Sequence, residues 1–193
     1  MGHLFNLAVG AMLATVGAAP AFASDETAIA VETAAATLAP GRYVWTDPGT
    51  AEPVTVVISL PLQRAFVYRG ETLVAATAVS TGTDDKPTPT GIYPILQKAA
   101  KHRSNLYDAS MPYMQRLTWD GIALHAGANP GFPASHGCIR LPAAFARKLF
   151  EVTALGTTVV VTDETAVEAR LDPELLRTEE MRANEAQLAS LVE

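Results

Sequence analysis

The only cysteine of the 193-residue chain, Cys138, stands in the stretch PASHGCIRLP at residues 133–142. His136 precedes it by two positions and Arg140 follows it by two. A thiolate is the reactive form of cysteine, and neighbouring cations lower the pKa of a thiol and so favour that form. Gly137, next to the cysteine, lets the backbone turn sharply and leaves amide groups free to face a substrate oxyanion. This pattern indicates a nucleophilic cysteine.

A second histidine, His125, is the candidate general base. It ends a predicted strand over residues 118–125, and a glycine-containing loop, AGANPGFPAS, leads from it back to the cysteine stretch. A loop this short can bring the end of a strand close to a thiol. We therefore expect His125 and Cys138 to form a Cys–His pair.

Two other interpretations use the same residues. Zinc accepts imidazole and thiolate ligands, but H-x-C with the other histidines far away matches no common ligand spacing. The candidate zinc ligands are His102, His125, His136 and Cys138. In the third interpretation the cysteine is a small buried hydrophobic residue and the histidines are ordinary surface residues.

The beginning of the chain resembles a secretory signal. An apolar run is followed by the A-x-A pattern at residues 21–23, which predicts a signal peptide over residues 1–23. Cleavage is favoured over an uncleaved membrane anchor because small residues crowd the end of the run. An exported chain with one cysteine can form no internal disulfide, and a lone thiol in an oxidising compartment is open to oxidation. A purely structural role for Cys138 is therefore less favoured. Residues 24–52, rich in Ala, Thr, Pro and Gly, are predicted to be a linker or a loose lead-in, with Tyr43 and Trp45 as candidates to dock on the following domain.

Charge is unevenly distributed. The formal net charge is -6, and the tail at residues 163–193 carries nine acidic and three basic residues. The rest of the chain is therefore balanced. No basic face for nucleic acid is indicated, and the Asp172-Pro173 pair in this acidic tail is a candidate helix start.

Residues 53–162 are predicted to form one mainly β domain of the α+β class. Short β-branched or apolar runs indicate strands at 54–60, 64–68, 73–80, 91–96, 118–125 and 157–162. Between residues 141 and 156, Phe145, Leu149 and Val152 recur at helical spacing. One helix is thus expected beside the cysteine.

Two blocks of the sequence resemble a known family. LHAG at 124–127 followed by SHGCIRLP at 135–142 is similar to the signature of the L,D-transpeptidase catalytic domain, or YkuD-like, family. Upstream, VSTG at 79–82 and PTPTG at 87–91 come in the matching order. The resemblance covers about residues 53–162 and implies a β-sandwich in which the cysteine lies in a cleft under a flap.

The resemblance implies a role for each matched residue. Cys138 matches the nucleophile and His125 the general base, with the backbone carbonyl of Ala126 holding the tautomer of the ring. Thr88 is expected to be structural. Positions expected to support the oxyanion or the substrate are Ser135, His136, Gly137 and Arg140.

The resemblance further implies a periplasmic cell-wall enzyme that needs no cofactor. It would transfer a peptidoglycan tetrapeptide stem, with loss of D-Ala, to an amine and so form 3→3 cross-links. Carbapenems are the expected covalent inhibitors. An L,D-carboxypeptidase, an enzyme that anchors proteins to peptidoglycan and a non-enzymatic wall-binding module remain alternatives. One departure concerns the nine residues between His125 and Ser135, a spacing shorter than is usual in the family.

Overall fold

The computed structural model describes residues 21–104, 108–165 and 168–178, together with the single positions 181, 183 and 187. The first twenty residues of the predicted signal peptide and most of the tail beyond residue 178 lie outside these ranges. Among the helices within the described ranges, none combines the length and the apolarity needed to cross a bilayer.

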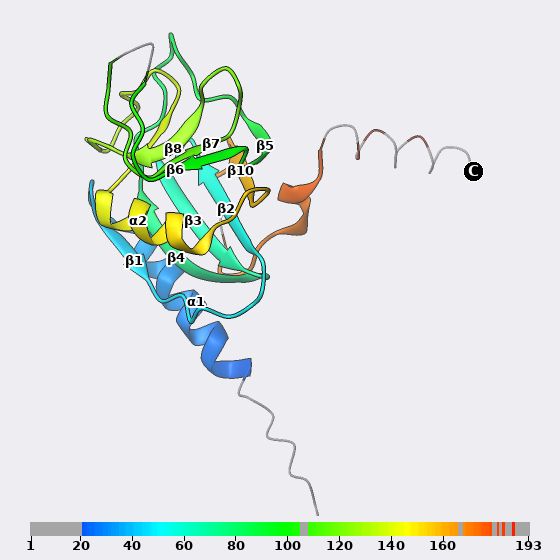
Figure 1. Cartoon of the computed structure of the whole chain (residues 1–193). Helices are drawn as coiled ribbons and strands as arrows, with labels where there is room; N and C mark the ends of the chain where they lie inside the picture. Colours follow the sequence, from blue (N-terminus) through cyan, green and yellow to red (C-terminus); the bar gives the residue numbers. More distant parts are fainter. Residues whose placement is uncertain are drawn as a thin grey trace, which may run out of the picture.

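A six-stranded sheet forms the base of the molecule, in the order β1-β4-β3-β2-β10-β5 (Figure 1). All six residues of β2 are buried, as expected for a central strand covered on both faces. β5 lies at the edge, as its Pro94 predicts. The strands are β1 (Tyr43–Trp45), β2 (Val54–Ser59), β3 (Arg64–Arg69), β4 (Thr72–Ala78), β5 (Gly91–Pro94) and β10 (Thr158–Thr162).

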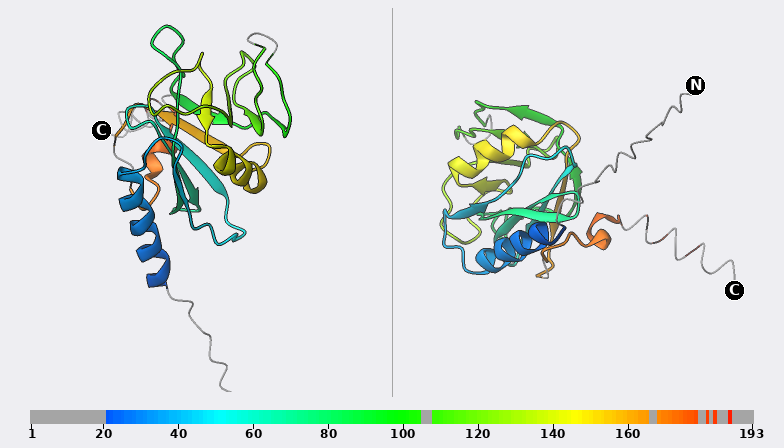
Figure 2. Two further views of the ribbon diagram at one scale, coloured as in Figure 1. Left: turned by 90° about the vertical axis from the view of Figure 1, so that its left-hand side faces the viewer. Right: turned by 90° about the horizontal axis from the view of Figure 1, so that it is seen from below.

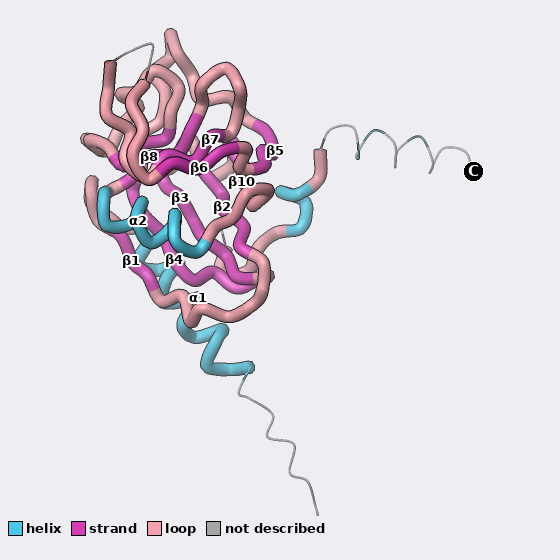
Figure 3. Tube along the Cα trace, in the orientation of Figure 1, coloured by secondary structure: helices cyan, strands magenta, loops and turns pink. Residues whose placement is uncertain are grey.

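A smaller sheet of four strands carries the cysteine region, in the order β6-β7-β8-β9. Its strands are β6 (Gln97–Ala99), β7 (Met114–Arg116), β8 (Ala123–Ala126) and β9 (Ile139–Leu141). Figure 3 shows that long loops gather at the end of the molecule where this sheet lies. The mainly β, two-sheet fold predicted from the sequence is confirmed.

Two α-helices cover opposite faces of the large sheet, as the view from below in Figure 2 shows. α2 (Ala143–Val152) buries Phe145 and Leu149 in the core between the two sheets. Trp45 of β1 packs edge-on against Phe145, with ring centroids 5.3 Å apart. This is the helix predicted beside the cysteine, and it directly follows β9.

The linker prediction for residues 24–52 is wrong for much of that segment. α1 (Ala21–Ala36) packs on the outer face of the large sheet and buries Ala28, Val31 and Ala35 there. Their spacing of three and then four residues places them on one face of the helix. The small alanine side chains allow the helix to pack on the sheet, and β1 then adds an edge strand.

Two further elements differ in their bounds from the sequence prediction. The strand expected over residues 118–125 begins only at Ala123, because residues 118–121 form a turn closed by the Gly121 N–H on the Thr118 carbonyl at 3.3 Å. In the tail a 3₁₀ helix, η1 (Pro173–Leu176), begins at the predicted Asp172 cap, whose carboxylate accepts from the Glu174 N–H at 2.9 Å.

Candidate active site

The small sheet places the cysteine and the histidine on the same face. β8 and β9 are parallel, with His125 directly opposite Arg140. Side chains alternate along a strand, so Cys138, two residues before Arg140, lies on the face that His125 occupies. Leu124 and Ile139 point to the other face and are fully buried in the core. The strand pairing thus brings together residues that the loop separates in sequence.

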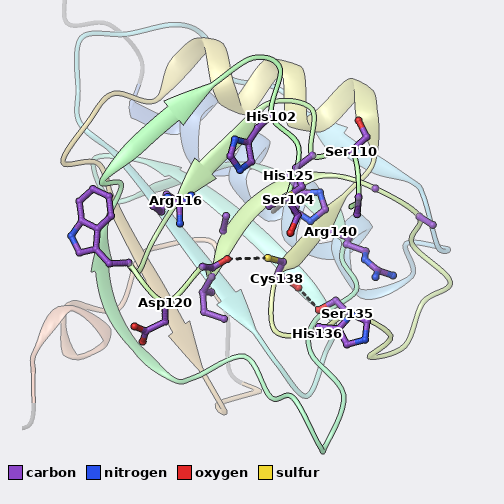
Figure 4. Close-up of a pocket in the computed structure, with 18 residues that line it drawn as sticks. His102, Ser104, Ser110, Arg116, Asp120, His125, Ser135, His136, Cys138 and Arg140 are labelled. Atoms are coloured by element: carbon purple, nitrogen blue, oxygen red, sulfur yellow. Dashed lines mark hydrogen bonds between the residues drawn. The ribbon is translucent and has the colours of Figure 1, made fainter. Parts of the chain in front are cut away.

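Both side chains line a pocket of about 630 Å³. In the close-up of Figure 4, Cys138 lies between Arg116 on one side and Arg140 on the other, with the His125 ring nearby. The polar residues lining the pocket are His102, Ser104, Ser110, Arg116, Asp120, His125, Ser135, His136, Cys138 and Arg140. Of the predicted site residues, only Gly137 and Ala126 do not line it directly.

The turn that presents the cysteine is held by Ser135. The Ser135 hydroxyl donates to the Cys138 carbonyl at 2.6 Å and accepts from the Gly137 N–H at 3.1 Å. Gly137 has φ +108°, and a Cβ there would lie 2.7 Å from Cδ1 of Ile122. Glycine is therefore required on conformational grounds, whereas a small movement of the Ile122 side chain would relieve the steric contact. The Gly137 N–H, expected to face an oxyanion, is instead bound by Ser135.

His125 is held as one tautomer. Its Nδ1 lies 2.8 Å from the Ala126 carbonyl oxygen, the contact that the family resemblance implies. A carbonyl only accepts, so Nδ1 carries the proton and Nε2 keeps its lone pair. Burial lowers the pKa of His125 below its ordinary value, and the charge of Arg140 acts in the same direction, whereas the hydrogen bond to Ala126 opposes them. The ring is therefore a neutral base at physiological pH.

The cysteine is held as a neutral thiol, which corrects the expectation that its cationic neighbours lower the thiol pKa and favour the thiolate. Sγ donates to the Gly121 carbonyl at 3.4 Å (Figure 4). Burial raises the pKa of Cys138 above its ordinary value, although the Ala123 N–H and the charges of Arg140 and Arg116 oppose it. The expected lowering by nearby cations is present but smaller than the cost of burying the charge.

These pKa directions predict how the thiol responds to pH. We expect the rate of alkylation of Cys138 by iodoacetamide to rise with a midpoint above about pH 8.5, the usual pKa of a free thiol. Alkylation followed by intact-mass spectrometry from pH 5 to 10 measures this, with a free cysteine peptide in the same buffers as control. A midpoint near pH 6 or below would instead indicate a preformed thiolate–imidazolium pair.

Arg116 is a feature of the pocket that was not predicted from the sequence, whereas Trp119 was a candidate to line the cleft. Arg116, at the end of β7, lines the pocket and holds its Nε against Gln97 Oε1 at 2.9 Å. Trp119 is 74% exposed at the rim and lies 6.0 Å from the Arg116 guanidinium. Arg116 follows a long irregular segment, and no spacing in the sequence ties it to Cys138.

The metal interpretation finds no cluster in the described residues. His102, His125, His136 and Cys138 all line the pocket. Within the described ranges, however, no three His, Cys, Asp or Glu side chains gather closely enough to hold a metal ion.

The sequence model of the L,D-transpeptidase catalytic domain, YkuD, matches residues 53–161, which is more than half of the chain. No match was found among curated proteins. Solved structures give 47 significant matches.

Three of these structures illustrate the likeness. An L,D-transpeptidase (Yku) from Stackebrandtia nassauensis is 29% identical to this chain and superposes with a TM-score of 0.54. The alignment covers 58% of this chain and 57% of the Stackebrandtia chain. An L,D-transpeptidase from Mycobacterium tuberculosis H37Rv is 25% identical, covers 56% and 57%, and has a TM-score of 0.53. LdtMt1, solved in complex with imipenem, shares the fold at 22% identity, 57% and 59% coverage and a TM-score of 0.56.

The fold and the pocket define an α+β domain with two sheets, in which a cysteine and a histidine lie on the same face of the smaller sheet. With the sequence match, the chain belongs to the L,D-transpeptidase catalytic domain family, YkuD. It spans less than two thirds of the length of each of the three matched proteins.

Proposed function

We propose that the chain is a cell-wall L,D-transpeptidase acting through a Cys138 thioester. The observation that carries this proposal is the neutral His125, held by Ala126 with Nε2 free, in the same pocket as the only cysteine. A base with a lowered pKa and a neutral thiol together suit general-base activation at neutral pH.

In the acylation step the Cys138 side chain turns from the Gly121 carbonyl toward the imidazole. Nε2 of His125 takes the thiol proton as sulfur attacks the carbonyl carbon of the third stem residue, a diaminopimelate in most Gram-negative walls. The C–N bond to the terminal D-Ala then breaks. Its nitrogen takes the proton from the imidazolium, and a thioester remains on the sulfur.

In the transfer step a second amine attacks the thioester carbonyl. Nε2 of His125 accepts a proton from the attacking amine and returns it to the departing sulfur. An amine from another stem gives a 3→3 cross-link. Water would make the protein an L,D-carboxypeptidase, and a protein lysine would make it an anchoring enzyme. Thioesters resist water more than amines, so amine transfer is the proposed reaction.

The charges of the pocket support an anionic peptide substrate. Arg116 and Arg140 lie on either side of Cys138 (Figure 4). Neither makes an ion pair with an acidic side chain in the described part of the chain. Stem peptides carry carboxylates next to the scissile bond, and arginine binds carboxylates in a two-pronged geometry.

The proposed location is the periplasm, with residues 1–23 acting as a signal peptide. The apolar run and the A-x-A pattern at residues 21–23 support this. Residues 25–36 would then stay with the mature domain as the packed part of α1.

The test is a product assay with the chain lacking residues 1–23. Incubated with purified disaccharide-tetrapeptide, it is expected to release D-Ala and to form 3→3 dimers, both identified by mass spectrometry. Tripeptide without dimer would indicate the carboxypeptidase. Sedimentation with sacculi without any turnover would indicate the wall-binding module and would overturn the proposal.

A further inference from the structure

The loop between β4 and β5, residues 79–90, packs directly against the turn that carries the cysteine. Two backbone N–H groups of that turn, those of Ala134 and Ser135, donate to the Thr81 carbonyl at 3.0 Å. In return the Thr83 N–H donates to the Ser135 carbonyl at 3.1 Å. The loop therefore forms a second wall behind the nucleophile, independent of the β8–β9 pairing.

Thr88 connects this loop to the turn through its side chain. Its side chain is buried, with 4% of the residue exposed. The hydroxyl donates to the Gly137 carbonyl at 2.7 Å and accepts from the Gly82 N–H at 2.9 Å. A Cβ at Gly82 would lie 2.7 Å from the Thr88 N and 2.9 Å from the Gly137 Cα, so the backbones approach too closely for any other residue.

The bond from Thr88 fixes the orientation of one peptide plane. The Gly137 carbonyl and the Cys138 N–H belong to the same peptide unit, which is trans like every peptide bond described. In a trans peptide these two groups point in opposite directions. Holding the carbonyl against Thr88 therefore aims the Cys138 N–H away from the 79–90 loop.

The Cys138 N–H is the donor next to the nucleophile that stays available. No acceptor for it is found in the described part of the chain, whereas the Gly137 N–H is bound by the Ser135 hydroxyl. The amide of a nucleophilic residue is well placed to donate to the oxyanion that forms when its side chain attacks a carbonyl. Gly137 lacks a Cβ, so nothing in its own side chain prevents the peptide from rotating once the carbonyl is released.

We propose that Thr88 is a positioning residue that locks the Gly137–Cys138 peptide with its N–H directed at the oxyanion. This inference rests on the proposed acyl transfer to Cys138 and extends it. It gives a catalytic reason for a threonine that the sequence indicates only as structural.

The experiment measures acylation of Cys138 by p-nitrophenyl acetate, whose attack by any thiol passes through an oxyanion. In Thr88→Val, which keeps the shape but loses the hydroxyl, we expect the burst of p-nitrophenol to slow about 10- to 100-fold, in the range for a disturbed oxyanion donor. Thr88→Ser should restore the rate to within about threefold of wild type. Thr90→Val, an exposed neighbour in the same loop, is the matched control and should leave the rate unchanged.

A readout that needs no oxyanion separates positioning from folding. Alkylation by iodoacetamide involves no tetrahedral intermediate, so its rate should be the same in Thr88→Val and wild type. A Thr88→Val protein that acylates at the wild-type rate would overturn the inference. So would a Thr88→Ser protein as slow as Thr88→Val, or an equal loss of alkylation and acylation. Because the ester is not a cell-wall substrate, these outcomes can be interpreted even if muropeptides are not turned over.

Discussion

Replacing the proposed nucleophile by Cys138→Ala is expected to abolish D-Ala release and cross-linking, a loss of about 10⁴-fold or more. In the proposed mechanism the sulfur makes and breaks the acyl bond, and no other cysteine exists in the chain to replace it. The same variant should remain unmodified by a carbapenem, whereas wild type gains the mass of one inhibitor. Intact-mass spectrometry and quantification of muropeptide products measure both.

The control for this variant is a test that it folds as wild type does. Cys138 is partly buried and packs beside Met111, Met114 and Ala123, so its thermal unfolding must be compared with that of wild type. A variant that unfolds at the same temperature and still releases D-Ala would remove the nucleophile assignment. A carbapenem adduct on the variant would place the reactive group elsewhere.

Replacing the proposed base by His125→Asn is expected to lower kcat/KM about 10²- to 10⁴-fold near pH 7. Asparagine keeps an N–H that can donate to the Ala126 carbonyl but offers no basic nitrogen. In the wild-type protein, His125 stays neutral at pH values below the ordinary pKa of histidine, because burial lowers the pKa of this side chain. In a plot of wild-type kcat/KM against pH, the acidic decline should therefore have its midpoint below about pH 6.5. The variant should lack this decline. Its kcat/KM should instead increase with pH as the thiol ionises by losing its proton to solvent.

Alkylation at high pH provides the control for the second variant. Above the pKa of Cys138 the thiol ionises without help, so His125→Asn and wild type should react with iodoacetamide at similar rates. If the variant has the same kcat/KM as wild type at pH 7, another group takes the proton from the thiol. An unchanged acidic decline would contradict the assignment of that decline to His125.

The interior of the domain could be predicted from the sequence because its strands carry their own signal. The run VTVVIS is β-branched and apolar throughout, and the structure buries all of it. Pro94 indicates an edge, and β5 lies at one. The helix after Cys138 shows its apolar face at regular spacing. Each of these signals is local, so no knowledge of the packing partner is needed.

α1 could not be predicted because its contacts are with small side chains. Two of its three core residues are alanines, which are common on exposed as well as buried surfaces. Its partner is the outer face of a sheet formed by residues far along the chain. The helical spacing of Ala28, Val31 and Ala35 is visible in retrospect, but an alanine-rich stretch with Thr, Pro and Gly nearby also suits a linker.

The composition of the site was predictable, but its electrostatics were not. Cys138 and His125 stand in recognisable blocks, and the pocket brings them together. The protonation state of the thiol depends on burial and on the Gly121 carbonyl, which a turn between β7 and β8 supplies. Cations near a cysteine in sequence predict a lowered pKa. Only the folded chain shows that burial outweighs them.

The packing of α1 has a practical consequence for recombinant work. A fragment trimmed to the matched segment, residues 53–161, would strip the cover from Val57, Phe66 and Val160. An apolar sheet surface left bare in this way favours self-association and poor solubility. The smallest well-behaved version of the domain therefore keeps residues 25–36 of α1, and affinity tags belong before Asp25.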